Sequence, residues 1–214
     1  MLALTETWLH ENIPTEAVSL ANYSFVRRDS PTEAVSLANY SFVRRDRGTR
    51  GGGVGIYIKK HVKFDVIPTS DSIEQLWIKI NLKKVTFVLG VVYRLPNQDY
   101  KTFSNELEDS FIICSSVADT IYLVGDFNID LLKTDCPSNS FFGDFTESLN
   151  LEQLIDQPTR VCSNHSSLID HICVTDSSMI LKSGVISSDL SDHDFIYLEL
   201  NLGLSPAQPI ITSG

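Results

Sequence analysis

The sequence predicts a mixed α/β (α+β) domain in which two packed sheets are flanked by helices. Short segments rich in Val, Ile, Tyr and Trp, at 54–58, 76–80 and 85–93, are typical of strands. Two longer segments, 101–118 and 140–151, carry apolar residues at helical spacing instead. Because strands and helices do not alternate as regularly as in βαβ units, two sheets with outer helices fit better than one parallel sheet.

The remaining elements follow from local patterns. Further strands are expected at 120–124, 167–174, 184–187 and 195–200, where apolar and β-branched residues recur between polar breaks. Each predicted helix has one apolar face, which should pack on a sheet. The residues that mark these faces are Phe103, Leu107, Phe111 and Cys114 in the first helix, and Phe141, Phe145 and Leu149 in the second.

Length and composition indicate one globular domain. At 214 residues, a single domain over 1–202 is expected, with 203–214 as a flexible tail because it lacks periodicity. The net charge of −10 argues against a non-specific nucleic-acid binder, which usually presents a basic surface. The four cysteines show no CxxC spacing, and neither a secretory signal nor a long apolar run is present. A soluble intracellular protein with no membrane span and no zinc site is therefore expected.

An internal repeat lies near the start of the chain. The sixteen residues 14–29 recur without a single change at 31–46, joined by Ser30. A solenoid needs more units than this and usually shows divergence between them. One copy is therefore expected to be surplus to the fold and to form an exposed loop.

Two polar clusters stand at the ends of apolar runs. Asp126 and Asn128 follow the run 121–124, and Asp192 and His193 precede the run 195–198. A third acid, Glu6, follows a strand-like start at 2–5. Two acids, an amide and an imidazole can hold a hard divalent cation and activate water against a phosphodiester. Asp126 and Asn128 are also common turn formers after a strand, which is the alternative interpretation.

Taken in chain order, these acids, the amide and the imidazole resemble the active-site residues of the endonuclease/exonuclease/phosphatase family of metal-dependent phosphoesterases. Other segments are similar to the endonuclease domains of LINE-type (non-LTR) retrotransposons, and the resemblance extends over 4–202. It implies a four-layer α/β/β/α sandwich and a DNA endonuclease that nicks target DNA for an adjoining reverse transcriptase. The segments are Arg-Gly-Gly-Gly-Val at 50–54, Val-Val-Tyr-Arg-Leu-Pro at 91–96 and Ser-Ser-Leu-Ile-Asp-His-Ile at 166–172.

The resemblance also implies roles for single residues. Glu6 and Asp192 would hold Mg²⁺, with Mn²⁺ as an alternative ion. In the parent element, such a domain would work in the nucleus with its reverse transcriptase. Glu6 as an ordinary solvent-facing strand residue is the alternative to a metal ligand.

The chemistry would be carried by five further side chains. Asp126 would orient or deprotonate the attacking water, with Asn128 as a neutral donor to the same site. His193 would donate to a phosphate oxygen, and Asp170 would fix the orientation of its imidazole. The hydroxyl of Tyr93 would reach the scissile phosphate. The alternative for Tyr93 is a half-buried strand aromatic with a wet hydroxyl.

The resemblance leaves part of the family pattern unmatched. The family's first strand, with its active-site Asn, and the helix that follows have no counterpart before Glu6, so the fold is expected to lack them. Two other functions stay open beside the endonuclease. One is an inactive remnant that serves as an interaction module, and the other is a phosphoesterase of the same fold acting on RNA, a lipid or an inositol phosphate.

Other basic and histidine residues carry weaker signals. Six arginines gather between 27 and 50, and this cluster is either a solvated loop or a phosphate contact. His10, His61, His165 and His171 lie outside any supporting motif and are expected to be ordinary surface or hydrogen-bonded residues.

Overall fold

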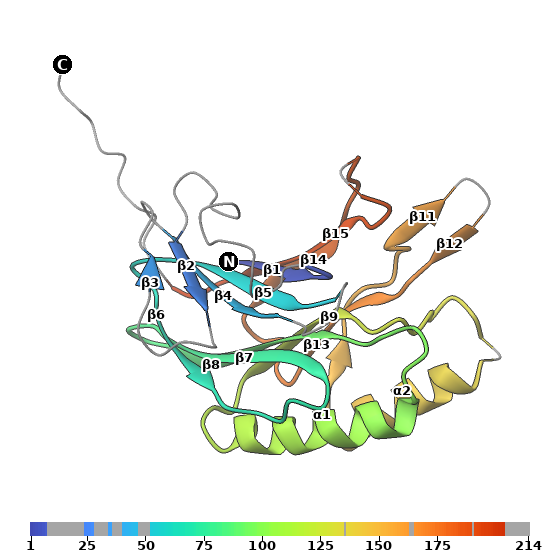
Figure 1. Ribbon diagram of the computed structural model, residues 1–214, viewed down its shortest axis with the longest axis horizontal. Coiled ribbons are helices and arrows are strands. Elements are labelled where there is room, and N and C mark those ends of the chain that lie inside the picture. The colour runs from blue at the N-terminus through green and yellow to red at the C-terminus, as the bar shows by residue number, and fades with distance from the viewer. Residues whose placement is uncertain are drawn as a thin grey trace.

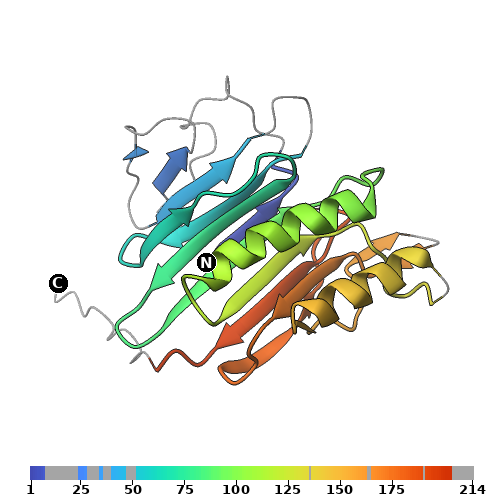
Figure 2. The same ribbon diagram turned by 90° about the horizontal axis from the view of Figure 1, so that it is seen from below.

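Two large sheets lie face to face, and both helices cover the outer face of one of them (Figure 1). The computed structural model describes residues 1–7, 24–27, 34–35, 40–46, 52–134, 136–162, 165–189 and 191–203. Figure 2 shows the two helices running across the sheet that they cover. The predicted mixed α/β sandwich is confirmed, and within the described ranges the helices pack on one sheet only.

The larger sheet has six strands in the order β10-β13-β9-β8-β7-β6. Its neighbours pair antiparallel except β8 with β9, which are parallel because helix α1 connects them. Helices below and the second sheet above bury the central strands on both faces, which explains their continuous apolar runs. The strands are β6 (Lys63–Ile67), β7 (Glu74–Asn81), β8 (Thr86–Tyr93), β9 (Ile121–Asp126), β10 (Glu152–Gln153) and β13 (Asp170–Val174).

The second sheet has five strands in the order β1-β5-β4-β2-β3, and two hairpins complete the fold. In the five-stranded sheet, β1 pairs only with β5 among the described residues. The β11–β12 hairpin projects away from both sheets (Figure 1). The strands are β1 (Leu2–Thr5), β2 (Ser24–Arg27), β3 (Ala34–Val35), β4 (Tyr40–Arg45), β5 (Val54–Lys59), β11 (Arg160–Cys162), β12 (His165–Ser167), β14 (Ile180–Ile186) and β15 (Phe195–Leu200).

Both helices begin at local signals in the sequence. Helix α1 (Tyr100–Ser115) starts after Asp99, whose carboxylate accepts a hydrogen bond from the backbone N–H of Thr102 at 2.8 Å. Helix α2 (Pro137–Ser148) starts at a proline, whose fixed φ suits the first helical position. Each helix begins and ends slightly earlier than the sequence pattern predicts. The apolar face predicted for α1 is confirmed, since all four of its marker residues are buried.

The core consists of two apolar layers, one on each side of the six-stranded sheet. Between the two large sheets, Ile56 of β5 packs with Leu76 and Val91, and all three are fully buried. Between the six-stranded sheet and the helices, Leu107 packs with Leu123 and Phe145. No helix in the described part of the chain is long and apolar enough to cross a membrane.

The repeated segments meet inside one sheet. Strand β2 from the first copy pairs in parallel with β4 from the second, and identical residues stand opposite each other, such as Phe25 with Phe42. Strand β4 lies between β2 and β5, and its Phe42 and Val43 are fully buried. Residues 24–27 of the first copy and 40–45 of the second thus both form strands of this sheet, and the expectation that one copy is surplus stays a prediction. The rest of the first copy and much of the second lie outside the described residues.

Candidate active site

Three neighbouring strands bring catalytic side chain types into one row. Tyr93 at the end of β8 stands opposite Asp126 at the end of β9, and Asp126 stands opposite Asp170 at the start of β13. Glu74 of β7 extends the row beyond Tyr93. Register partners on adjacent strands point to the same face of a sheet, so these side chains lie together on the face that packs against the other sheet.

Asp126 is placed by Gly125 and held by Asn128. Gly125 has a φ of +144°, and a Cβ there would lie 1.9 Å from the carbonyl oxygen of Val92, so only glycine fits. Asp126 is 3% exposed. Its Oδ1 accepts from the backbone N–H of Asn128 at 2.8 Å, and its Oδ2 accepts from Nδ2 of Asn128 at 3.1 Å. Burial, together with the negative charge of Asp170, raises the pKa of Asp126 to about 7.

A buried arginine fixes the loop that carries Asn128. The Arg94 guanidinium donates to the carbonyl oxygens of Phe127 at 2.6 Å, Asn128 at 2.8 Å and Gln98 at 2.6 Å. It also lies 4.2 Å from the ring centroid of Tyr100, at a distance suited to a cation–π contact. In return, Nδ2 of Asn128 donates to the Arg94 carbonyl oxygen at 2.8 Å. The loop after β9 is thus held by charge-assisted bonds from the end of β8.

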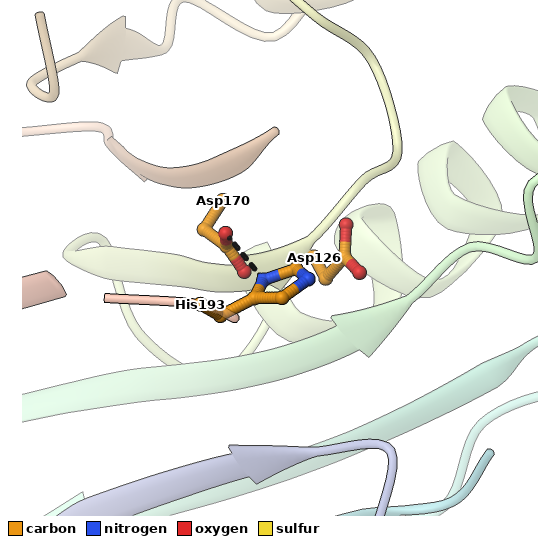
Figure 3. Close-up of side chains that lie close together, drawn as sticks. All are labelled: Asp126, Asp170 and His193. Atoms are coloured by element: carbon orange, nitrogen blue, oxygen red, sulfur yellow. Dashed lines mark hydrogen bonds and ion pairs between the residues drawn. The ribbon is translucent and has the colours of Figure 1, made fainter. Parts of the chain in front are cut away.

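Asp170 and His193 form a hydrogen-bonded pair. His193 Nδ1 lies 2.9 Å from Asp170 Oδ2, and this bond raises the pKa of His193 above its ordinary value. With Nδ1 donating, Nε2 is on the side of the ring turned toward Asp126, as Figure 3 shows. One ligand atom from each of Asp126, Asp170 and His193 lies within 4.8 Å of the others. An acid of shifted pKa therefore stands beside an oriented imidazole.

Thr159 supports the Asp170–His193 pair through hydrogen bonds from a buried position. Its side chain is fully buried, and Oγ1 donates to Asp170 Oδ2 at 2.7 Å. The same Oγ1 accepts from the backbone N–H groups of Asp170 at 3.1 Å and Ile169 at 3.2 Å. The Thr159 carbonyl also accepts from the backbone N–H of Asp194 at 2.7 Å. Thr159 thus joins the Asp170 strand to the loop that carries His193.

Glu6 lies against Tyr93 on the other side of the row. The Tyr93 hydroxyl donates to Glu6 Oε1, and burial, followed by this bond, raises the pKa of Tyr93. Glu6 sits in a left-handed conformation with a φ of +49°, directly after β1. The glycine-rich segment supports this turn, because the Gly53 carbonyl accepts from the backbone N–H of Thr7 at 3.2 Å. Gly53 has a φ of +91°, a conformation that other residues rarely adopt, and a Cβ there would also lie 2.5 Å from Thr7 Oγ1.

Asp192 is paired with an arginine at the surface. Its Oδ2 accepts from Arg160 Nε at 2.8 Å and from Arg160 Nη2 at 2.5 Å, which holds the pKa of Asp192 below its usual range. Arg160 is also bridged through its backbone to His193. The seven site residues predicted from the sequence therefore fall into three contact groups: Asp126 and Asn128 with Asp170 and His193 nearby, Glu6 with Tyr93, and Asp192 with Arg160.

Three supporting residues escaped the sequence analysis. Arg94 lies inside the motif at 91–96, in which Tyr93 is the predicted site residue. Thr159 and Arg160 stand outside every motif, and their partners are more than ten residues away in sequence. His171 is a hydrogen-bonded core residue, as expected. It is fully buried, and desolvation lowers its pKa to about 4.

Two arginines of the predicted cluster, Arg44 and Arg45, make contacts inside the protein. Arg44 is 1% exposed and forms an ion pair with Asp46 at 3.0 Å. Arg45 forms an ion pair with Asp71 and donates to the Gln75 carbonyl oxygen at 3.2 Å. The Arg45 contact with Gln75 links β4 to β7 of the six-stranded sheet, whereas the Arg44 ion pair lies within the β4 segment.

The site fits a hard divalent cation. Its donors are mainly carboxylate oxygens, the ligands that Mg²⁺ prefers. Burial and, to a smaller extent, the negative charges of Asp170 and Glu6 raise the pKa of Asp126, so a further negative charge is unfavourable at this position. A cation would relieve this repulsion, and the exposed carboxylates of Glu6 and Asp192 are open to solvent.

Residues 1–193 match the Endonuclease/Exonuclease/phosphatase family, so the chain belongs to this family of hydrolytic nucleases and phosphatases. No curated protein matches the sequence. Among solved structures, the fold is similar to the endonuclease domain of TRAS1, a telomere-specific non-LTR retrotransposon. That match has 15% identity and a TM-score of 0.64, and it covers 78% of this chain and 88% of that one.

Two further structures share the fold. One is the 3′ phosphatase NExo from Neisseria, bound to a product DNA hairpin, at 14% identity and a TM-score of 0.59. That match covers 93% of this chain and 88% of the phosphatase. The other is an endonuclease/exonuclease/phosphatase family protein from Leptotrichia buccalis, at 17% identity and a TM-score of 0.58, with coverage of 76% and 71%.

Proposed function

We propose that this protein is a Mg²⁺-dependent DNA endonuclease of the non-LTR retrotransposon type. The observation that carries the proposal is the cluster of Asp126, Asp170 and His193 beside the Tyr93–Glu6 pair. Two proteins of similar fold, the TRAS1 endonuclease domain and the phosphatase bound to a DNA hairpin, support DNA as the substrate. In a parent element, the domain would act in the nucleus beside a reverse transcriptase.

The base of the reaction and a hydrogen-bond donor to the phosphate come from the same small group. Asp126 takes a proton from the attacking water, and a pKa of about 7 suits a base that works near neutrality. The two hydrogen bonds from Asn128 hold the carboxylate in one orientation. His193 donates from Nε2–H to a non-bridging phosphate oxygen, because Nδ1 is committed to Asp170.

Glu6 and Asp192 would be the ligands of the metal ion. Mg²⁺ held by these two carboxylates would supply positive charge to the phosphate. The Tyr93 hydroxyl keeps Glu6 Oε1 in place, which leaves Oε2 as the oxygen for a cation. Thr159 keeps Asp170 aligned with the imidazole through its 2.7 Å bond.

A plasmid relaxation assay tests the proposal. Supercoiled DNA should be converted to the open circular form in Mg²⁺ and protected by EDTA. Asp144→Asn is a matched control, because Asp144 is exposed on α2, and this variant should nick like the parent. Nicking by the parent that persists without a divalent ion would overturn the proposed mechanism.

A second substrate separates the endonuclease from the alternatives. Metal-dependent hydrolysis of bis-p-nitrophenyl phosphate, with no nicking of DNA, would point to a phosphoesterase of the same fold. A protein that melts cooperatively but hydrolyses neither substrate would point to an inactive remnant. Either result would reject DNA nicking as the function.

A further inference from the structure

Arg160 stands at a junction between two parts of the site. Both Nε and Nη2 of its guanidinium bond to one oxygen, Oδ2 of Asp192. The contact is anchored by the main chain, since Arg160 bridges to His193 and the Thr159 carbonyl accepts from Asp194. Because the main chain around Arg160 is bonded to the main chain around Asp192, the two side chains start from fixed and neighbouring positions.

This pairing conflicts with a metal-binding role for the same carboxylate. A cation at Asp192 would have a guanidinium as its neighbour, and two positive charges at such short range repel each other. The largest electrostatic partner of Arg160 is Asp192, and the negative charge of Asp126 adds a smaller attraction. Arg160 and a cation therefore compete for Asp192.

A cavity gives the guanidinium a second place to go. Arg160, Lys133 and His165 line a space of about 410 Å³ that also borders Asn128. Lys133 is partly neutralised by Asp130 at 3.4 Å, so the cavity wall combines two cations with one buried acid. The volume admits a phosphodiester group, and a guanidinium binds phosphate oxygens through two parallel donors.

We propose that Arg160 couples nucleic-acid binding to metal binding: without nucleic acid it occupies Asp192, and a backbone phosphate in the adjoining cavity draws it away and frees the carboxylate for a divalent cation. This inference rests on the proposed function, because it takes Asp192 as a metal ligand. Coupling of this kind is reciprocal, so the cation and the nucleic acid each strengthen the binding of the other by the same factor.

This coupling makes the affinity for the cation depend on whether nucleic acid is bound. The free protein holds its cation weakly, and the complete site assembles only when a phosphate backbone is in place. An exposed ion pair contributes little free energy, so breaking the Arg160–Asp192 pair should change the cation affinity by only about two- to fivefold. That range is large enough to measure and small enough to leave folding unchanged.

Mn²⁺ binding tests the inference without relying on catalysis. The dissociation constant for Mn²⁺ is measured by electron paramagnetic resonance for the parent, Arg160→Gln and Lys133→Gln. Lys133→Gln is the matched control, because it removes a cation from the same cavity without touching Asp192. Arg160→Gln should bind Mn²⁺ about two- to fivefold more tightly than the parent, and Lys133→Gln should bind it like the parent.

The coupling is tested by adding a short DNA duplex. The duplex should tighten Mn²⁺ binding in the parent but not in Arg160→Gln, and a methylphosphonate duplex of the same sequence should have no effect in either. Arg160→Lys, which keeps one positive charge but loses the paired donors, should fall between the two.

Each result is separable from nicking. Equal Mn²⁺ affinity in the parent and Arg160→Gln, including absence of binding in both, overturns the inference even if plasmid is nicked. Tightening by the duplex that survives in Arg160→Gln also overturns it. An affinity difference in the expected direction supports the inference even in a protein that nicks no plasmid.

Discussion

Replacing Asp126 with Asn should stabilise the folded protein above pH 7 while it abolishes nicking. Burial raises the pKa of Asp126 from 3.8 to about 7, so the folded state holds a proton that the unfolded chain releases much earlier. The stability that this proton contributes is complete below the unfolded pKa and is lost as the pH rises through the folded pKa. Above pH 7 the folded protein must bury a charge, and Asn removes that cost.

The size of the effect follows from the same shift. A gap of about 3 pH units at about 1.4 kcal/mol per unit gives about 4 kcal/mol at full ionisation. Asn would set its own amide against Nδ2 of Asn128, which loses one hydrogen bond worth about 1 kcal/mol. The net gain at pH 8.5 should be about 3 kcal/mol. At pH 5.5, where the parent keeps about 2 kcal/mol of the proton-linked stability, the gain should fall to about 1 kcal/mol.

The assay is urea unfolding in EDTA at pH 5.5 and 8.5, followed by tryptophan fluorescence, to which the buried Trp77 contributes. Asp144→Asn is the control, because the same chemical change at an exposed helix position should leave the free energy of unfolding within about 0.5 kcal/mol at both pH values. A gain for Asp126→Asn that is equal at the two pH values would refute the reasoning. So would a variant that is less stable than the parent at pH 8.5.

Three other predictions concern activity and the repeat. His193→Ala should lower the nicking rate by about 100-fold or more, the scale of a lost donor to the charged oxygens of the transition state, and a rate near that of the parent would remove His193 from the site. Thr159→Val should lower the nicking rate by about tenfold or more, because Asp170 is then misplaced. Thr159→Ser keeps the hydroxyl and should nick at a rate close to that of the parent. Equal losses in both variants would mean that the hydrogen bond to Asp170 is not responsible. Deletion of 30–46 should leave a folded protein, because the remaining copy carries the same residues to the place beside β5. Circular dichroism melting checks this, and loss of the cooperative transition would show that both copies belong to the core.

The sequence predicts best what depends on neighbouring residues. The apolar spacing in α1 and the turn that follows β9 are local features, so both could be expected before the structure. The pairing of β2 with β4 could not, because the repeat offers two equal candidates for one place beside β5. Local pattern ranks identical segments equally, and only the packing of the whole sheet distinguishes them.

The same distinction applies to the site. Asp170 and His193 could be named because each lies in a motif that resembles those of a family, and the structure places them 2.9 Å apart. Thr159 and Arg160 could not be named, since their roles arise from contacts across 11 and 32 residues of sequence. A polar residue after a proline has no pattern that reveals such distant partners.

The row formed by Tyr93, Asp126 and Asp170 makes strand alignment itself a condition of activity. A single inserted or deleted residue within β8, β9 or β13 would move one member of the row to the opposite face of the sheet. Substitutions elsewhere in these strands only alter packing, but a change of length would remove a reactive group at once. We therefore expect insertions and deletions to be tolerated in the hairpins and loops around the site and to be excluded from these three strands.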